Sequence, residues 1–122
     1  MKINYRIIES KGIDQAVIRY NELKQNEDES YKFSESQLNN LGYFYLAEEK
    51  SVNNAIEIFK LNVKSFPDSF NPYDSLGEAY MVNKEYALAI KNYEKSFELN
   101  PNNTNAKSMV NQINEKLKSE NK

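Results

Sequence analysis

Two stretches of this chain repeat the same order of residue types at one fixed spacing. The second stretch contains Tyr73, Leu76, Gly77, Tyr80, Ala89, Tyr93 and Pro101, and the first contains Leu41, Gly42, Tyr45, Ala55, Phe59 and Pro67. Ala55 and Ala89, Phe59 and Tyr93, and Pro67 and Pro101 each lie 34 residues apart. A repeat of this length predicts stacked pairs of helices, because one pair cannot bury its apolar face alone.

Apolar residues recur within each stretch at the three- and four-residue spacing of one helix face. In the second stretch these residues are Tyr73, Leu76, Tyr80 and Met81 for one helix, and Ala87, Ala89, Ile90, Tyr93 and Phe97 for the next. Gly77 and Ala89 are small, as residues must be where two helices cross closely. We expect most repeat aromatics in the core, namely Tyr45, Phe59, Tyr73, Tyr80, Tyr93 and Phe97, and Tyr86 on the surface.

Helix ends also leave signals in the sequence. Asn71 followed by Pro72 is typical of an N-cap and first helical residue, and Asn83 is a plausible cap for the following helix. Pro101 should end that helix. Ser34 with Gln37 three residues later predicts a capping box. Gly42 and Gly77 are 35 rather than 34 residues apart, which places one inserted residue in the turn at 48–51.

The repeat resembles the tetratricopeptide (TPR) repeat, W-x₂-L-G-x₂-Y…A-x₃-F…P, with Tyr73 in place of the tryptophan and Tyr93 in place of the phenylalanine. This resemblance implies an all-α fold, a right-handed superhelical α-solenoid of TPR helix pairs with about seven helices. We expect a single domain over residues 1–122. Its parts would be a degenerate repeat (2–25), a loop (26–33) whose Tyr31 and Phe33 fold back on neighbouring helices, two full repeats (34–67 and 68–101) and a capping helix (103–119). The apolar stripe of the capping helix consists of Ala106, Met109, Val110, Ile113 and Leu117.

Several longer sequence segments are similar to the C-terminal TPR tail of bacterial serine hydrolases. They include Gly12-Ile13-Asp14, Phe66-Pro67-Asp68-Ser69 and Tyr73-Asp74-Ser75-Leu76-Gly77. Those enzymes are of the class C β-lactamase-like and esterase types, mostly from Bacteroidetes. The resemblance implies an accessory or oligomerisation domain for such an enzyme. It does not bring catalysis with it, because the catalytic residues of those enzymes lie in a separate domain.

The composition excludes several kinds of site. The 122 residues include neither histidine nor cysteine, so a Ser–His relay and the usual zinc ligands are missing. Glu27, Asp28 and Glu29 lack the spacing and glycine of a calcium loop. We therefore expect no enzyme activity, catalytic residue, metal or cofactor. A net charge of −2 and no basic block disfavour a nucleic acid partner, and no stretch is apolar enough for membrane insertion.

A protein-binding surface remains as the leading hypothesis. In TPR proteins the first helix of each pair lines a concave groove that holds a peptide or partner segment. The corresponding groove positions here are Asn39, Tyr43, Asn71, Asp74, Glu78 and Gln112. The asparagines offer both a donor and an acceptor to a peptide backbone. The negative charges of Asp74 and Glu78 favour a neutral or basic segment.

Two other functions stay open at this point. The chain could be the accessory tail of a hydrolase, or it could form a structural homodimer through an uncovered end of the stack. If the chain is the tail of a hydrolase, we expect it in the periplasm or envelope. If it is a complete stand-alone chain, we expect it in the cytoplasm.

Overall fold

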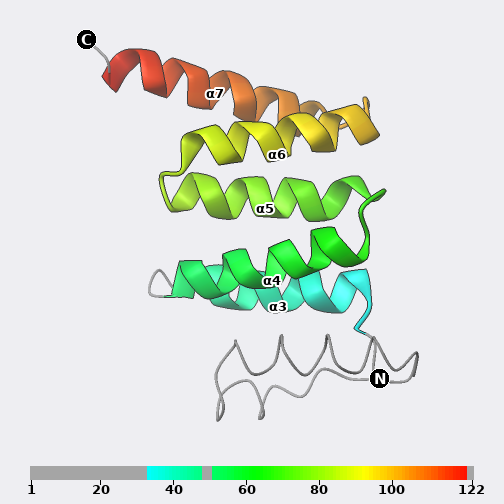
Figure 1. Cartoon of the computed structure of the whole chain (residues 1–122). Helices are drawn as coiled ribbons and strands as arrows, with labels where there is room; N and C mark the ends of the chain where they lie inside the picture. Colours follow the sequence, from blue (N-terminus) through cyan, green and yellow to red (C-terminus); the bar gives the residue numbers. More distant parts are fainter. Residues whose placement is uncertain (1–32, 48–50, 121–122) are drawn as a thin grey trace.

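A computed structural model describes residues 33–47 and 51–120, which form five α-helices and no strand. The helices are α3 (Glu35–Leu46), α4 (Val52–Ser65), α5 (Phe70–Val82), α6 (Tyr86–Leu99) and α7 (Thr104–Glu120). Figure 1 shows them stacked in chain order, each running opposite to the helix before it. The predicted all-helical repeat is confirmed over this part of the chain. The count of seven helices and the superhelical twist stay predictions.

Several predictions concern residues beyond the described part. The degenerate repeat at 2–25, the loop at 26–33 except its last residue, and the turn at 48–51 predicted to hold the inserted residue, except Ser51, lie outside the described residues. Phe33 does pack as predicted, against the buried residues Leu38 and Leu41 of α3 and their neighbours on α4.

The first described helix begins at the predicted capping box. Gln37 N–H donates to Ser34 Oγ at 3.0 Å, and Ser34 N–H donates to Gln37 Oε1 at 2.9 Å. Two of the four backbone N–H groups that a helix start leaves unpaired are thereby satisfied. Helix α6 ends at Leu99 with Asn100 as its C-cap, directly before Pro101, so the predicted stop is also confirmed.

The predicted start of α5 is wrong by two residues. Helix α5 begins at Phe70 after Ser69, so Asn71 and Pro72 both lie inside its first turn instead of at its cap. Proline is tolerated there because the N–H groups of the first turn have no partner within the helix in any case. The pair Asn71-Pro72 therefore marked the right turn of the helix but not its first residue.

Asn83 is also not the cap of α6. It is the C-cap of α5, and Glu85 precedes α6 without a side-chain capping bond. Glu85 N–H donates to Tyr80 O at 2.9 Å and Lys84 N–H donates to Met81 O at 3.0 Å, which together form a Schellman motif. Lys84 consequently adopts a φ of 62°, the left-handed conformation that this motif requires. A lysine carries out here the task that glycine usually performs.

The core runs along the stack between paired helices. Its buried residues come from α4 (Ala55, Ile56, Phe59), α5 (Leu76, Ala79, Tyr80), α6 (Ala89, Tyr93) and α7 (Ala106, Ile113). Phe59, Tyr80 and Tyr93 are buried as predicted, whereas Tyr45 and Phe97 pack against the core while partly exposed. Tyr73 is also partly exposed, and its hydroxyl donates to Pro67 O at 2.8 Å.

Small residues allow the closest crossings in this core. Gly42 of α3 lies against the ring of Phe59, and Gly77 of α5 lies against the ring of Tyr93. The two contacts are equivalent in the two repeats, which explains why each repeat pairs a glycine on its first helix with an aromatic residue on its second.

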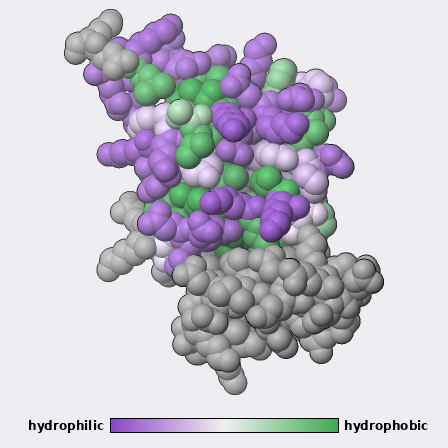
Figure 2. Space-filling model, viewed as in Figure 1, coloured by the Kyte–Doolittle hydropathy of each residue, from purple (hydrophilic) through white to green (hydrophobic). Residues whose placement is uncertain are grey.

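The predicted burial of two neighbouring residues at the start of α6 needs correction. Tyr86 is partly buried and packs against the core, because α7 covers the start of α6. Ala87, predicted to lie on the buried stripe of α6, is exposed, since the stripe runs through Ala89 and Tyr93 instead. On the face shown in Figure 2, hydrophobic side chains form separate patches among hydrophilic ones.

Candidate functional site

Four of the six predicted groove residues lie together on one surface. Helices α3 and α5 are in direct contact, although α4 separates them in the chain. Ser75 Oγ donates to Asn39 Oδ1 at 2.5 Å, and the Tyr43 hydroxyl lies within hydrogen-bonding reach of the same serine. We call this surface, formed by Asn39, Tyr43, Asp74, Ser75 and Glu78, the α3–α5 face.

Two carboxyl groups give the α3–α5 face its charge. Asp74 and Glu78 lie one turn apart on α5, and both side chains are partly buried. Burial raises the pKa of Asp74, while the nearby Asn103 amide lowers it. Burial also raises the pKa of Glu78, and the negative charge of Asp74 adds to the rise. Each carboxylate is thus incompletely solvated and lies beside a second negative charge.

One carboxylate oxygen is left without a partner. Asp74 Oδ1 is buried and accepts no hydrogen bond from the residues that the structure describes. Asn103, at the start of α7, approaches the carboxyl group and at the same time donates from Nδ2 to Ser96 Oγ at 2.9 Å. A buried acceptor of this kind costs free energy until a donor reaches it, about 1–3 kcal/mol in typical cases.

Tyr43 forms the aromatic part of the α3–α5 face. Its ring meets the ring of Phe59 edge-on, with centroids 5.2 Å apart and planes at 68°. Burial raises the pKa of the Tyr43 hydroxyl, the hydrogen bond with Ser75 lowers it, and the charges of Glu78 and Asp74 raise it further. The hydroxyl therefore stays protonated at neutral pH and remains a donor and an acceptor.

The other two predicted groove residues lie elsewhere. Asn71 is in the first turn of α5, one turn before Asp74, and is partly buried. Gln112 is exposed on α7, where its Nε2 donates to Ser108 Oγ at 3.2 Å. Gln112 lines a different hollow, at the far end of α5 from Asp74.

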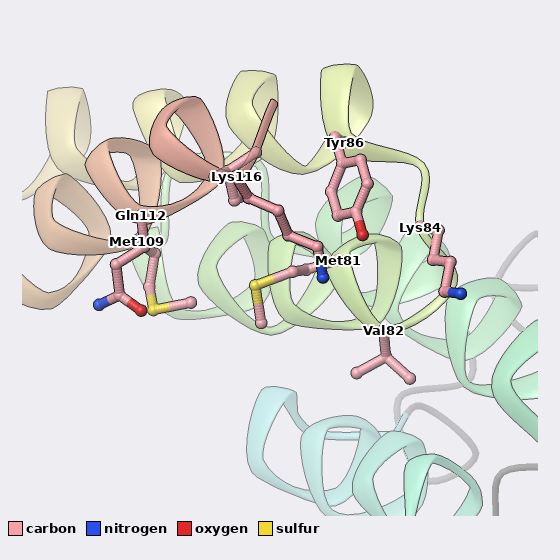
Figure 3. A pocket seen from close by; sticks show the side chains of 8 residues that line it. Met81, Val82, Lys84, Tyr86, Met109, Gln112 and Lys116 are labelled. Atoms are coloured by element: carbon pink, nitrogen blue, oxygen red, sulfur yellow. The ribbon is translucent and has the colours of Figure 1, made fainter. Parts of the chain in front are cut away.

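That hollow has a volume of about 410 Å³ and lies between α5, α6 and α7. Its walls are Met81, Val82, Tyr86, Met109, Gln112 and Ile113, and we call it the methionine pocket. Lys84 and Lys116 also line it. Figure 3 shows Met109 and Gln112 projecting from α7, and Lys116 reaching from α7 toward Met81 and Tyr86.

Sequence reasoning missed Ser75, Asn103 and Lys116 as members of these two surfaces. Ser75 is 1% exposed and connects Asn39 to Tyr43. The sequence feature that could have identified Ser75 is that a small polar residue directly precedes the packed Leu76. A larger side chain at that position would separate α3 from α5. Lys116 lies outside the predicted apolar stripe of α7, and nothing in the sequence shows that it lies near Tyr86.

The described residues contain no group of three or more histidine, cysteine, aspartate or glutamate side chains that could hold a metal ion. Among these helices, none combines the length and the apolar character needed to cross a bilayer.

Comparison with known proteins supports the repeat. Residues 75–103 match the family model described as the tetratricopeptide repeat. A segment of 60 residues, 49% of this chain, is 35% identical to the human (Homo sapiens) protein named Superkiller complex protein 3. That segment spans only 4% of the human protein. The resemblance to a hydrolase tail, the homodimer and the cellular compartment stay predictions.

Proposed function

We propose, from the premise that residues 75–103 form a tetratricopeptide repeat, that this chain is a non-catalytic protein-interaction module that binds a partner segment on its α3–α5 face. TPR repeats in general mediate contacts between proteins. The name of the human relative likewise refers to a protein complex. A binding role also agrees with a set of polar side chains that carry no nucleophile–base pair.

The observation that carries the proposal is the pair of partly buried carboxylates. Asp74 and Glu78 are held close to each other at a cost in solvation, and Asp74 Oδ1 has no donor among the described residues. A partner that brings N–H groups or a lysine or arginine side chain to the exposed parts of these two carboxylates offsets part of this cost, although Asp74 Oδ1 itself stays buried. We therefore expect a neutral or basic extended segment, with Tyr43 as an apolar wall and the Asn39 amide donating to the backbone of the segment.

The test uses fluorescein-labelled peptides of equal length that carry lysine, glutamine or glutamate at the same alternate positions. By fluorescence anisotropy, the lysine peptide should bind most tightly, the glutamine peptide less tightly and the glutamate peptide least tightly. Glu78→Gln should reduce the preference for lysine over glutamine about two- to fivefold, as expected for a partly exposed ion pair. Raising the salt concentration should have the same effect.

Glu94→Gln is the matched control, because it removes one negative charge from the exposed surface of α6. The proposal is wrong if no peptide of the set binds, or if Glu78→Gln and Glu94→Gln change binding equally. Asn71→Ala and Gln112→Ala test the remaining two predicted contacts, and unchanged affinity would remove those residues from the site.

A further inference from the structure

The methionine pocket is a second surface whose chemistry differs from that of the α3–α5 face. Two of the three methionines of the chain, Met81 and Met109, line it together with Ile113 and Val82. Its volume of about 410 Å³ lies within the range of ~300–1,000 Å³ found for ligand pockets. Methionine side chains are flexible and polarizable, so they adapt to apolar groups of different shape.

The charge at the pocket is positive. Lys84 and Lys116 line it, and none of its lining residues is acidic. Lys116 Nζ lies 5.5 Å from the centroid of the Tyr86 ring, so its charge is held beside the pocket by a cation–π contact. Hydrogen bonding with Tyr86 raises the pKa of Lys116, which keeps the amine charged, and Glu120 adds to that rise. An approaching carboxylate would thus meet a cation and a partly apolar wall.

Position along α5 separates the two surfaces. Asp74 and Glu78 occupy the middle turns of the helix, and Met81 and Val82 occupy its last turn. The negative charges therefore precede the apolar pocket along α5, Lys84 follows it, and Lys116 reaches it from α7. A segment lying along α5 would meet surfaces of opposite charge at its two ends.

We propose that the methionine pocket binds one apolar side chain of a protein partner, and that a carboxylate next to it in the partner sequence pairs with Lys116. This inference rests on the proposed function and names the partner chemistry at the second surface: an apolar residue such as phenylalanine or leucine followed by aspartate or glutamate. The Gln112 carbonyl oxygen is available to a backbone N–H of the same segment, since only Nε2 of that side chain bonds to Ser108. Charge complementarity and the apolar lining favour this occupant.

The experiment uses the full chain labelled with ¹³C at its methionine methyl groups. Two-dimensional NMR spectra would be recorded during titration with a peptide that has blocked termini and whose single charged residue is the glutamate of one Phe-Glu pair. Met81→Leu and Met109→Leu variants assign the signals. We expect the Met81 and Met109 signals to shift with one common Kd. A peptide with Phe-Gln should bind about two- to fivefold more weakly, and one with Ala-Glu should bind more weakly than the Phe-Glu peptide.

Two pairs of variants isolate the charge. Lys116→Gln should weaken the Phe-Glu peptide but not the Phe-Gln peptide, whereas Lys118→Gln, at a more distant exposed site on α7, should change neither. Gln112→Glu adds a negative charge to the pocket wall and should weaken the Phe-Glu peptide. Asn114→Asp adds the same charge to the exposed side of α7 and should have no effect. Circular dichroism of each variant checks that the helices remain intact.

The outcomes separate this inference from the proposed function. If lysine-bearing peptides bind in a Glu78-dependent manner while the methionine signals do not respond to Phe-Glu, the inference is wrong and the proposed function stands. If the methionine signals respond and Lys116→Gln lowers affinity while Glu78→Gln has no effect on any peptide, the pocket stands and the α3–α5 face is not the binding surface. A response that is equal for Phe-Glu and Phe-Gln rejects the role given to Lys116.

Discussion

Replacing Gly42 by alanine should destabilise the protein more than the same substitution at Gly77, although the two glycines are equivalent in the repeat. A Cβ on Gly42 would lie 2.2 Å from Phe59 Cε1 and 2.6 Å from Cδ1 and Cζ. A Cβ on Gly77 would lie 3.0 Å from Tyr93 Cγ and 3.1 Å from Cδ1 and Cδ2. Carbon atoms in favourable contact are about 3.5–4.0 Å apart. Phe59 must therefore move by roughly 1 Å or more, and Tyr93 by roughly half of that.

The expected magnitudes follow from two opposing effects. Alanine is preferred over glycine inside a helix by about 1 kcal/mol. Overpacking a core costs about 1–3 kcal/mol, and Phe59 is 0% exposed, so its ring has no free space to enter. For Gly42→Ala we take the upper part of that range and expect a net loss of about 1–2 kcal/mol. For Gly77→Ala the lower part applies, and the two effects should nearly cancel.

Urea unfolding followed by far-ultraviolet circular dichroism measures both free energies. Phe59→Leu provides the internal control, because leucine has no counterpart of Cε1 and Cζ, two of the three ring atoms that the new Cβ would meet. In that background Gly42→Ala should be neutral or stabilising by up to about 1 kcal/mol, which gives a coupling free energy of about 1–3 kcal/mol in the double-mutant cycle. Equal stability of the two alanine variants, or a Gly42→Ala penalty that persists with leucine at position 59, would refute this reasoning.

Three further predictions concern charge, capping and backbone conformation. Burial raises the pKa of Asp74 and Glu78 above their ordinary values of 3.8 and 4.5, so the folded state binds more protons than the unfolded state just above those values. Stability should therefore fall as the pH rises through this window, and urea unfolding of Asp74→Asn with Glu78→Gln should show a flatter pH profile. Ser34→Ala should cost about 1 kcal/mol in thermal unfolding, and Ser51→Ala less, because the Ser51 side chain makes no capping bond. Lys84→Gly should raise the unfolding free energy by about 0.5–1 kcal/mol, since φ is 62° there; a loss of stability would show that the lysine side chain contributes more than the relieved strain.

Local chemistry made much of the fold predictable from the sequence. The capping box at Ser34 and the stop before Pro101 depend on residues three or fewer positions apart, so their signals are complete within a short window. The stripes through Leu76, Tyr80 and Tyr93 depend only on the helix period. Predictions were less accurate where two residues competed for one role. Ser69 and Asn71 are both good N-caps, and α5 begins after Ser69 even though the Ser69 side chain makes no capping bond.

The two proposed binding surfaces were predictable only in part, because they depend on how helices from different repeats meet. Equivalent repeat positions placed Asn39 beside α5, but the partner of its carbonyl oxygen is Ser75, which is 36 residues away and outside the predicted set. The same equivalence grouped Gln112 with Glu78, whereas α7 carries Gln112 to the methionine pocket, beside Met81 and Tyr86. A repeat pattern fixes the direction of each side chain relative to its own helix. The neighbours that it meets depend on the residues across the interface, and these change from one repeat to the next. The result is two surfaces of opposite charge along α5, and the positive one takes its lysines from the residue Lys84 after the helix and from α7.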